Sequence, residues 1–145
     1  MQANKLYMPL ALAGTLPFVA CAVLLLSGTD WVPQLGRVDA VASSYGLAIV
    51  CFMAGTLWGS HLSGQYTGSL NLFVLSNILF LAVWFAFIGA SLAVAIGVQV
   101  IAFLGLLVVD YRLRESGVIS AHYFQIRCMA TVIAVAALVT VLLFR

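Results

Sequence analysis

The stretch Gly55–His61, with the sequence GTLWGSH, closes the second of five long apolar segments in this chain of 145 residues. Its two glycines, Gly55 and Gly59, stand four residues apart. This spacing puts them on one face of a helix and lets a neighbouring backbone come close. Trp58 stands where an apolar helix would leave the hydrocarbon of a bilayer, a depth that favours an indole ring. We therefore interpret the stretch as a helix-packing seam that ends in a polar cluster.

The composition of the whole chain supports a membrane setting for this stretch. Only 7% of the residues are charged and 65% are hydrophobic, whereas a soluble domain carries about 25% charged residues. The charges stand near the ends of apolar runs of about 20 residues, the length that crosses a bilayer core. Backbone groups in lipid must form their hydrogen bonds within the segment, which makes the spans helices. The sequence predicts an all-α polytopic membrane protein with a bundle of five transmembrane helices.

The predicted spans form one transmembrane domain over residues 1–145. They lie at about residues 6–28, 40–60, 70–88, 91–109 and 122–144, with loops expected at 29–39, 61–69 and 111–121. Pro17 stands in the middle of the first span and removes one helix hydrogen bond. We expect it to kink this span near Ala13 and Gly14, toward the face of Gly55 and Gly59.

The positive charges predict how the bundle is oriented. Five spans place the two termini on opposite sides of the membrane. The N-terminal side receives four positive charges and the other side two: Lys5, Arg112, Arg114 and Arg127, against Arg37 and Arg145. Because positive residues favour the cytoplasmic side, the N-terminus is expected inside and the C-terminus outside.

This topology brings the ends of three spans to the same cytoplasmic rim. The polar and aromatic side chains expected there are Trp58, His61, Asp110, His122, Tyr123 and Arg127. We interpret them as one polar cluster, either ligand-binding or structural. No catalytic residue is predicted, because no pairing of a nucleophile with a base stands out. The sequence therefore favours a protein that is not an enzyme.

Arg127 is the most informative member of this cluster. It lies about one turn inside an apolar span, where a charge is expensive and usually faces a partner in the bundle. Asp110 is the candidate partner, since the fourth and fifth spans are joined by a short loop and must be neighbours. The alternative is that Arg127 extends to the lipid headgroups while Asp110 stays in water. The sequence leaves both possibilities open.

The sequence gives little support for binding of a metal or of nucleic acid. His61 and His122 could ligate haem or a metal or relay protons, but they equally suit interfacial polar positions. No metal site is predicted, because neither the histidines nor the three cysteines have the spacing of a ligand set. A net charge of +2 is too small to indicate nucleic acid. No cofactor is therefore predicted, with haem and quinone kept as alternatives.

Several short motifs recur in an order typical of a known family. They are Gly14-Thr15-Leu16-Pro17-Phe18, then Tyr45, Gly55 and Trp58-Gly59, then Ser76-Asn77 and Trp84, then Asp110, and finally Tyr123 to Arg127 with Thr131. Over nearly its whole length the chain resembles domain-of-unknown-function family 3429, small five-span proteins that include transmembrane protein 69. His61 departs from the family pattern. The resemblance implies a five-helix fold in a bacterial inner membrane or a mitochondrion, and it implies no activity.

No long hydrophilic stretch stands between the spans, so any binding must occur within the bundle or at its rims. We favour an accessory, assembly or ligand-binding subunit of the bacterial inner membrane, with a lipid or a quinone as ligand. Its expected partners are the bilayer and either a larger membrane complex or further copies of itself. A small transporter, a proton-relay protein and an enzyme acting on a lipid-soluble substrate remain alternatives. Five spans give no inverted repeat, which argues against transport.

Overall fold

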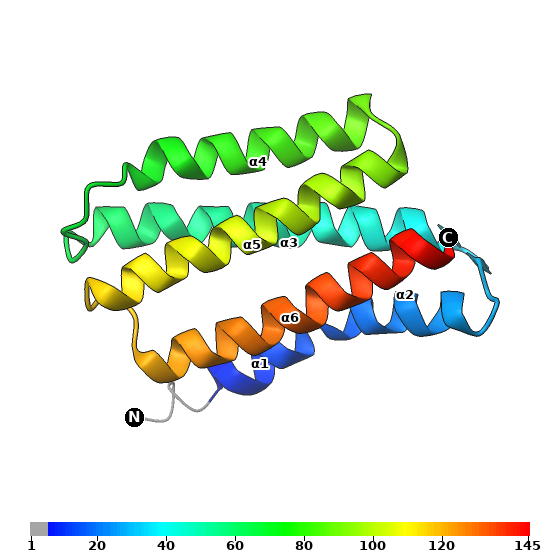
Figure 1. Ribbon diagram of the computed structural model, residues 1–145, viewed down its shortest axis with the longest axis horizontal. Helices are drawn as coiled ribbons and strands as arrows, with labels where there is room; N and C mark the ends of the chain where they lie inside the picture. Colours follow the sequence, from blue (N-terminus) through cyan, green and yellow to red (C-terminus); the bar gives the residue numbers. More distant parts are fainter. Residues whose placement is uncertain (1–5) are drawn as a thin grey trace.

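The computed structural model describes residues 6–145 as a bundle of helices that lie side by side along one long axis (Figure 1). The helices are α1 Tyr7–Ala13, α2 Leu16–Leu26, α3 Val38–Leu62, α4 Leu72–Gly89, α5 Leu92–Glu115 and α6 Ala121–Phe144. The first two are halves of one span, so the described chain has five segments that are long and apolar enough to cross a membrane. This confirms the predicted all-α fold with five transmembrane helices.

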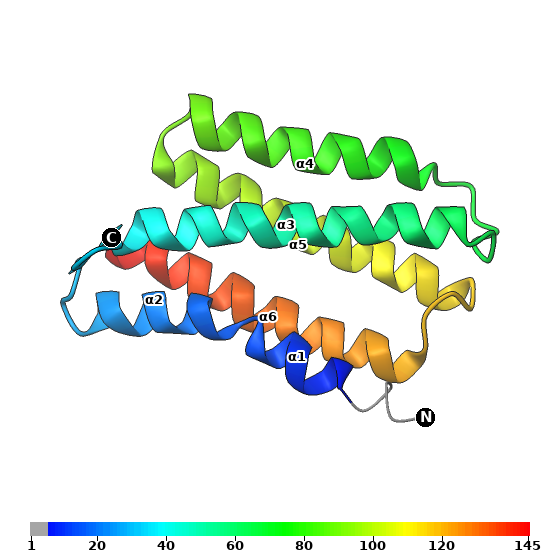
Figure 2. The ribbon, with the colours of Figure 1, turned by 180° about the vertical axis from the view of Figure 1, so that it is seen from behind.

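Helix α3 lies at the centre of the bundle. It packs against α4, α5 and α2, and α6 packs against α5, α2 and α1. Figures 1 and 2 show α4 along one edge of the bundle and the first span along the opposite edge. The chain therefore places α1 and α2 beside α6, although more than ninety residues separate α6 from either helix in the sequence.

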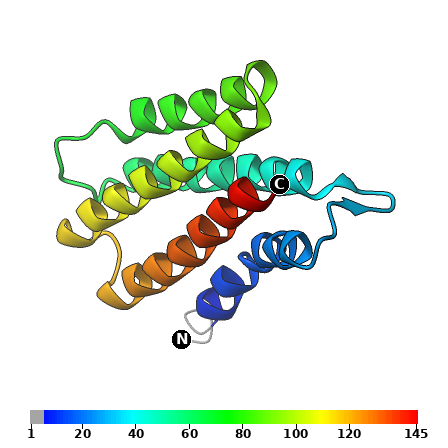
Figure 3. The same ribbon diagram turned by 45° about the vertical axis from the view of Figure 1, so that its right-hand side comes forward.

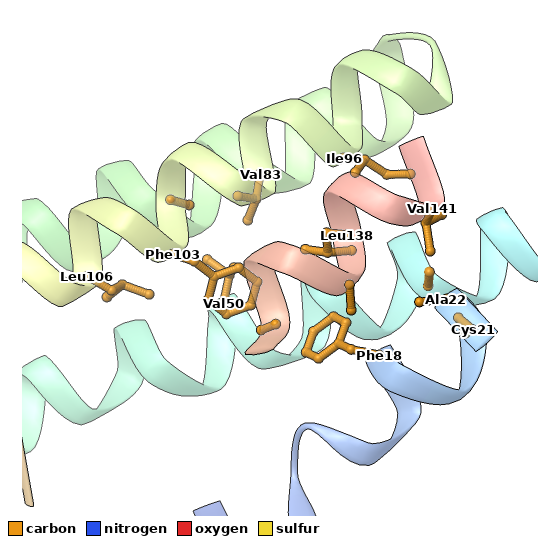
Figure 4. Packing of buried hydrophobic residues seen from close by; sticks show 14 of the residues in the cluster. Phe18, Cys21, Ala22, Val50, Val83, Ile96, Phe103, Leu106, Leu138 and Val141 are labelled. Carbon is orange, nitrogen blue, oxygen red and sulfur yellow. The ribbon is translucent and has the colours of Figure 1, made fainter. Parts of the chain in front are cut away.

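The core is made of apolar side chains contributed by all five spans. Figure 4 shows Phe18, Val50, Phe103 and Leu138 pointing toward one another from α2, α3, α5 and α6. The rings of Phe18 and Phe103 meet edge to face, with their centroids 5.8 Å apart. In lipid such contacts stabilise the bundle mainly through close packing, because the surrounding acyl chains are as apolar as the core.

The first span is broken where the sequence predicted a kink. Helix α1 ends at Ala13 and α2 begins at Leu16, with Pro17 in the first turn of α2. The Thr15 hydroxyl donates to the Leu12 carbonyl oxygen at 2.6 Å, and the Tyr45 hydroxyl of α3 donates to the Gly14 carbonyl oxygen at 2.7 Å. Neighbouring hydroxyls thus replace helix hydrogen bonds at the break.

Two of the three predicted loops have different bounds in the structure. Residues 29–39 contain a small hairpin of β1 Trp31–Val32 and β2 Gly36–Arg37, which projects beyond the helices (Figure 3), and α3 already begins at Val38. At the other end, α5 continues through residues 111–115, so the prediction of a loop there is wrong. A helix can continue beyond the bilayer. Arg112 and Arg114 stabilise the last turn of α5, and the chain leaves the helix only near Gly117, where φ is +78°.

The predicted packing role of Gly55 and Gly59 is also wrong. Both glycines are exposed, and a Cβ added at either would meet no described atom within 4 Å. The first span therefore does not kink against them. The close approach on α3 lies at Gly46, where a Cβ would come within 2.9 Å of the Gln99 side-chain carbon Cδ on α5. A Gly-x-x-x-Gly spacing makes one helix face smooth, but it does not determine which face meets a neighbour.

Candidate functional site

Asp110 and Arg127 form an ion pair between α5 and α6. The Arg127 Nε donates to Asp110 Oδ2 at 2.9 Å, and each side chain is only 11% exposed. The two helices are neighbours because a short turn at residues 116–120 joins them. Arg127 therefore does not extend to the headgroups, and the carboxylate offsets the cost of burying its charge.

The ion pair leaves part of the guanidinium free for other contacts. Arginine has five N–H donors. Only the one on Nε is used by Asp110, and the Nη groups make no hydrogen bond with any residue from 6 to 145. Arg127 also lines a cavity on the first-span side of α6. The site thus combines a neutralised charge with unused hydrogen-bond donors.

This cavity, here called the crevice, has a volume of about 320 Å³ and lies between the first span, α3 and α6, with Phe103 of α5 at its inner wall. Its room comes from the broken first span: α1 packs against α6, whereas α2 packs against both α6 and α3. Small residues enlarge it further, among them Ala11, Gly14 and Ala130. The break predicted from Pro17 therefore makes room for a cavity and does not bring the first span against Gly55 and Gly59.

Aromatic contacts close the end of the crevice nearest the ion pair. The Tyr7 hydroxyl is hydrogen bonded to His122 Nδ1 at 2.6 Å, and the rings of Tyr7 and Tyr123 meet edge to face at 5.5 Å. Tyr123 and Arg127 stand one turn apart on the same face of α6 and both line the crevice. Four of the six predicted cluster residues are therefore associated: Asp110, His122, Tyr123 and Arg127.

Trp58 and His61 belong to a different group. Both rings pack against Phe73 of α4, with centroid distances of 4.6 Å for Trp58 and 4.2 Å for His61, and neither residue lines the crevice. The expectation of one cluster was wrong in this respect, because α4 folds back along α3 and places Phe73 against both rings. His61 and His122 thus contact different helices, and the geometry lends no support to their acting as a shared ligand pair.

A second charged group, which the sequence analysis did not single out, lies at the opposite rim. Asp39 is only 3% exposed and accepts hydrogen bonds from Arg37 Nε at 3.0 Å and Arg37 Nη2 at 2.6 Å. Arg145 Nη1 lies 3.7 Å from the same carboxylate. The hydrogen bonds that Arg37 donates to Asp39, together with the negative charge of Asp39, raise the pKa of Arg37. The available signal was the position of an acid in the first turn of a helix, where the helix dipole stabilises it.

The sequence pattern also did not identify most residues of the crevice as site residues. Its aromatic walls are formed by Tyr7, Phe18, Phe52, Phe103 and Tyr123. Only Tyr123 was selected as a site residue. The rest sit on helices that are apolar on every side, where hydrophobic periodicity does not separate the inner face from the face toward lipid. Only the helix packing brings them together.

Comparison with known proteins gives one match. The model of a family described as "Protein of unknown function (DUF3429)" matches residues 3–143, which include every residue of the crevice and of the Asp110–Arg127 pair. No curated protein and no solved structure matches the chain.

Proposed function

Since the chain belongs to the DUF3429 family, whose function is unknown, we propose that this small integral membrane protein binds one amphipathic molecule of the bilayer in the crevice. The observation that carries the proposal is the free side of the Arg127 guanidinium at the end of a mainly apolar cavity. An apolar body would fill the crevice, and a polar head would accept hydrogen bonds from Arg127.

The size and lining of the crevice suit a small ligand. Ligand pockets usually measure about 300–1,000 Å³ and carry a few polar groups on mainly apolar walls. At about 320 Å³ the crevice has room for one ring system or one short chain. The hydroxyls of Tyr7 and Thr15 are bonded to His122 and to the Leu12 carbonyl oxygen. The other polar side chains of the lining lie on α6, at Tyr123, Arg127 and Thr131, and they would fix the orientation of the bound molecule.

The mouth of the crevice faces the lipid. Leu10 of α1 and Phe52 of α3 both line the crevice, yet each is 67% exposed on the outer surface of the bundle. Apolar side chains at a mouth favour entry from hydrocarbon over entry from water. We therefore infer that the ligand enters sideways from the bilayer, between α1 and α3.

The membrane and the orientation are part of the same proposal. We place the protein in a bacterial inner membrane, with the Arg127 end of the crevice on the cytoplasmic side. Support comes from the positive charges: Arg112, Arg114 and Arg127 share that end of the bundle, while Arg37 and Arg145 share the other. Lys5, counted toward the same side in the sequence, lies outside the described residues.

The test is the amount of small molecule that stays with the purified protein. The wild-type protein and two variants are purified in mild detergent, extracted with organic solvent, and analysed by mass spectrometry. Ala11→Trp fills the crevice from α1, whereas Ala13→Trp adds the same side chain at an exposed position of the same helix that does not line the crevice. We expect about one bound molecule per chain in the wild type and in Ala13→Trp, and a loss in Ala11→Trp.

Equal amounts in all three proteins, or none in any, would contradict binding in the crevice. Absence of a small molecule together with a protein that copurifies in fixed ratio would instead support an accessory subunit of a larger complex. Normal elution of Ala11→Trp from a size-exclusion column shows that the loss of ligand is not a loss of fold.

A further inference from the structure

We infer that the ligand is a quinone-type molecule, a neutral planar ring that bears carbonyl oxygens and carries an apolar tail. This inference rests on the proposed function and adds to it the chemical class of the ligand. Three observations point to it: the charge of the site, the aromatic walls, and the spacing of the hydrogen-bond donors.

The charge of the site favours a neutral head. Arg127 is the only charged residue among the described residues that line the crevice, and Asp110 already neutralises it at 2.9 Å. An anionic head, such as a phosphate or a carboxylate, would leave a buried net negative charge beside Asp110. A carbonyl oxygen accepts a hydrogen bond from an Arg127 Nη group without changing the net charge.

The walls favour a ring over a flexible chain. Five aromatic side chains line the crevice, and three of them, Phe18, Phe52 and Phe103, lie beyond the polar end. Aromatic rings pack against one another in edge-to-face or offset arrangements that contribute beyond the area they bury. An acyl chain would gain nothing specific from such walls, whereas a planar ring can use them.

Three hydrogen-bond donors follow one another along one face of α6. Tyr123, Arg127 and Thr131 follow one another at intervals of four residues, so they form a stripe along one helix face. The backbone N–H of Tyr123 donates to the Ser120 hydroxyl, whereas the side-chain hydroxyls of Tyr123 and Thr131 make no hydrogen bond within residues 6–145. The two carbonyl oxygens of a para-quinone are separated by nearly the ~5.4 Å pitch of one helical turn. Two neighbouring donors of the stripe can therefore each bind one carbonyl oxygen.

The experiment compares two probes that share an alkyl tail. The protein is reconstituted in nanodiscs of a saturated phosphatidylcholine and titrated calorimetrically with decylubiquinone, a quinone ring on an alkyl tail, or with dodecyl phosphate, which is anionic and has no ring. We expect decylubiquinone to bind at one saturable site and dodecyl phosphate to bind at least tenfold more weakly. Ala11→Trp is expected to abolish quinone binding.

Variants then test the donors. Tyr123→Phe removes one hydroxyl and is expected to raise the Kd for decylubiquinone about tenfold, or ~1.4 kcal/mol. The double variant Asp110→Asn with Arg127→Gln keeps a neutral polar pair but removes the guanidinium, and it should raise the Kd further. Tyr111→Phe, at an exposed tyrosine outside the crevice, is the matched control and should leave the Kd unchanged.

The failure of this inference can be told apart from the failure of the proposed function. Tighter binding of dodecyl phosphate than of decylubiquinone would overturn the quinone assignment and leave a ligand site for anionic lipids. Both probes could bind weakly to a protein that still retains, on purification, a molecule that Ala11→Trp loses. That result would overturn the quinone assignment and leave the proposed function intact. Weak binding of both, with no retained molecule, would remove the proposed function as well.

Discussion

Asp110 and Arg127 form a buried ion pair that uses only one of the three guanidinium nitrogens. The carboxylate holds the guanidinium in place through Nε, and the Nη groups remain available to the crevice. The cost of burying either charge alone is several kcal/mol, whereas the pair is close to balanced. Stability and ligand binding should therefore respond differently to single and double changes.

Asp110→Asn is expected to destabilise the protein by about 3 kcal/mol, because it leaves the Arg127 charge buried without its counter-charge. Adding Arg127→Gln should recover part of this loss, since the two sites are in direct contact and their effects are not additive. Unfolding followed by circular dichroism in increasing denaturing detergent measures both. Additive losses in the double variant would show that the pair does not stabilise the fold.

Gly46 is the glycine of α3 at which a side chain has no room. Gly46→Ala is expected to destabilise the bundle by about 1–3 kcal/mol, because the new Cβ overlaps the carboxamide of Gln99. Gly55→Ala, on the exposed face of the same helix, is the matched control and should not lower stability. Thermal unfolding in detergent measures the two variants side by side. A larger loss at Gly55 than at Gly46 would restore the packing role predicted from the sequence.

At the scale of the elements, the broken first span depends on a hydroxyl from another helix. Tyr45→Phe removes the donor to the Gly14 carbonyl oxygen and leaves the ring in place against Phe18. We expect a loss of about 1 kcal/mol of stability, the usual net contribution of one hydrogen bond. Calorimetry in detergent, with Tyr111→Phe as the exposed control, measures it. An unchanged midpoint for Tyr45→Phe would mean that the break needs no support from α3.

The sequence predicts elements of this protein better than it predicts their faces. The apolar runs indicate five helices because hydrocarbon leaves the backbone no other choice, and Pro17 locates the break because it lacks an N–H group. The sequence does not predict which face of each helix is buried in the bundle. On α3 the buried Leu57 and the exposed Gly55 are equally compatible with lipid, so only packing decides between them. The sequence identifies Asp110 as the candidate partner of Arg127, because a buried charge needs a partner, and the structure decides between this pair and the alternative that both side chains are solvated.

At the scale of the whole molecule, the fold puts the hairpin between α2 and α3 at one end of the bundle and the loop between α3 and α4 at the other (Figure 1). We expect a cysteine at Gln34 to react with a membrane-impermeant maleimide from outside intact cells, and a cysteine at Gln65 to react only after the membrane is opened. Labelling in cells of a variant without the three native cysteines measures this. The reverse pattern would contradict the orientation, and labelling of both positions from one side would contradict the five spans.

The crevice is a property of the whole bundle. Its walls come from α1, α2, α3, α5 and α6, and it exists because the two halves of the first span rest on different neighbours. No local stretch of sequence contains this information. The polar residues of α6 could be selected from the sequence as a site, but the apolar walls that complete it could not.

An experimental structure of the protein crystallised from a lipidic phase is the most direct test of the crevice as a binding site. We expect elongated density between α1 and α3, with its polar end within about 3 Å of an Arg127 Nη atom, the length of a hydrogen bond. The contradicting result is α1 packed against α3, with Leu10 resting on Phe52 and no space between the helices and Arg127.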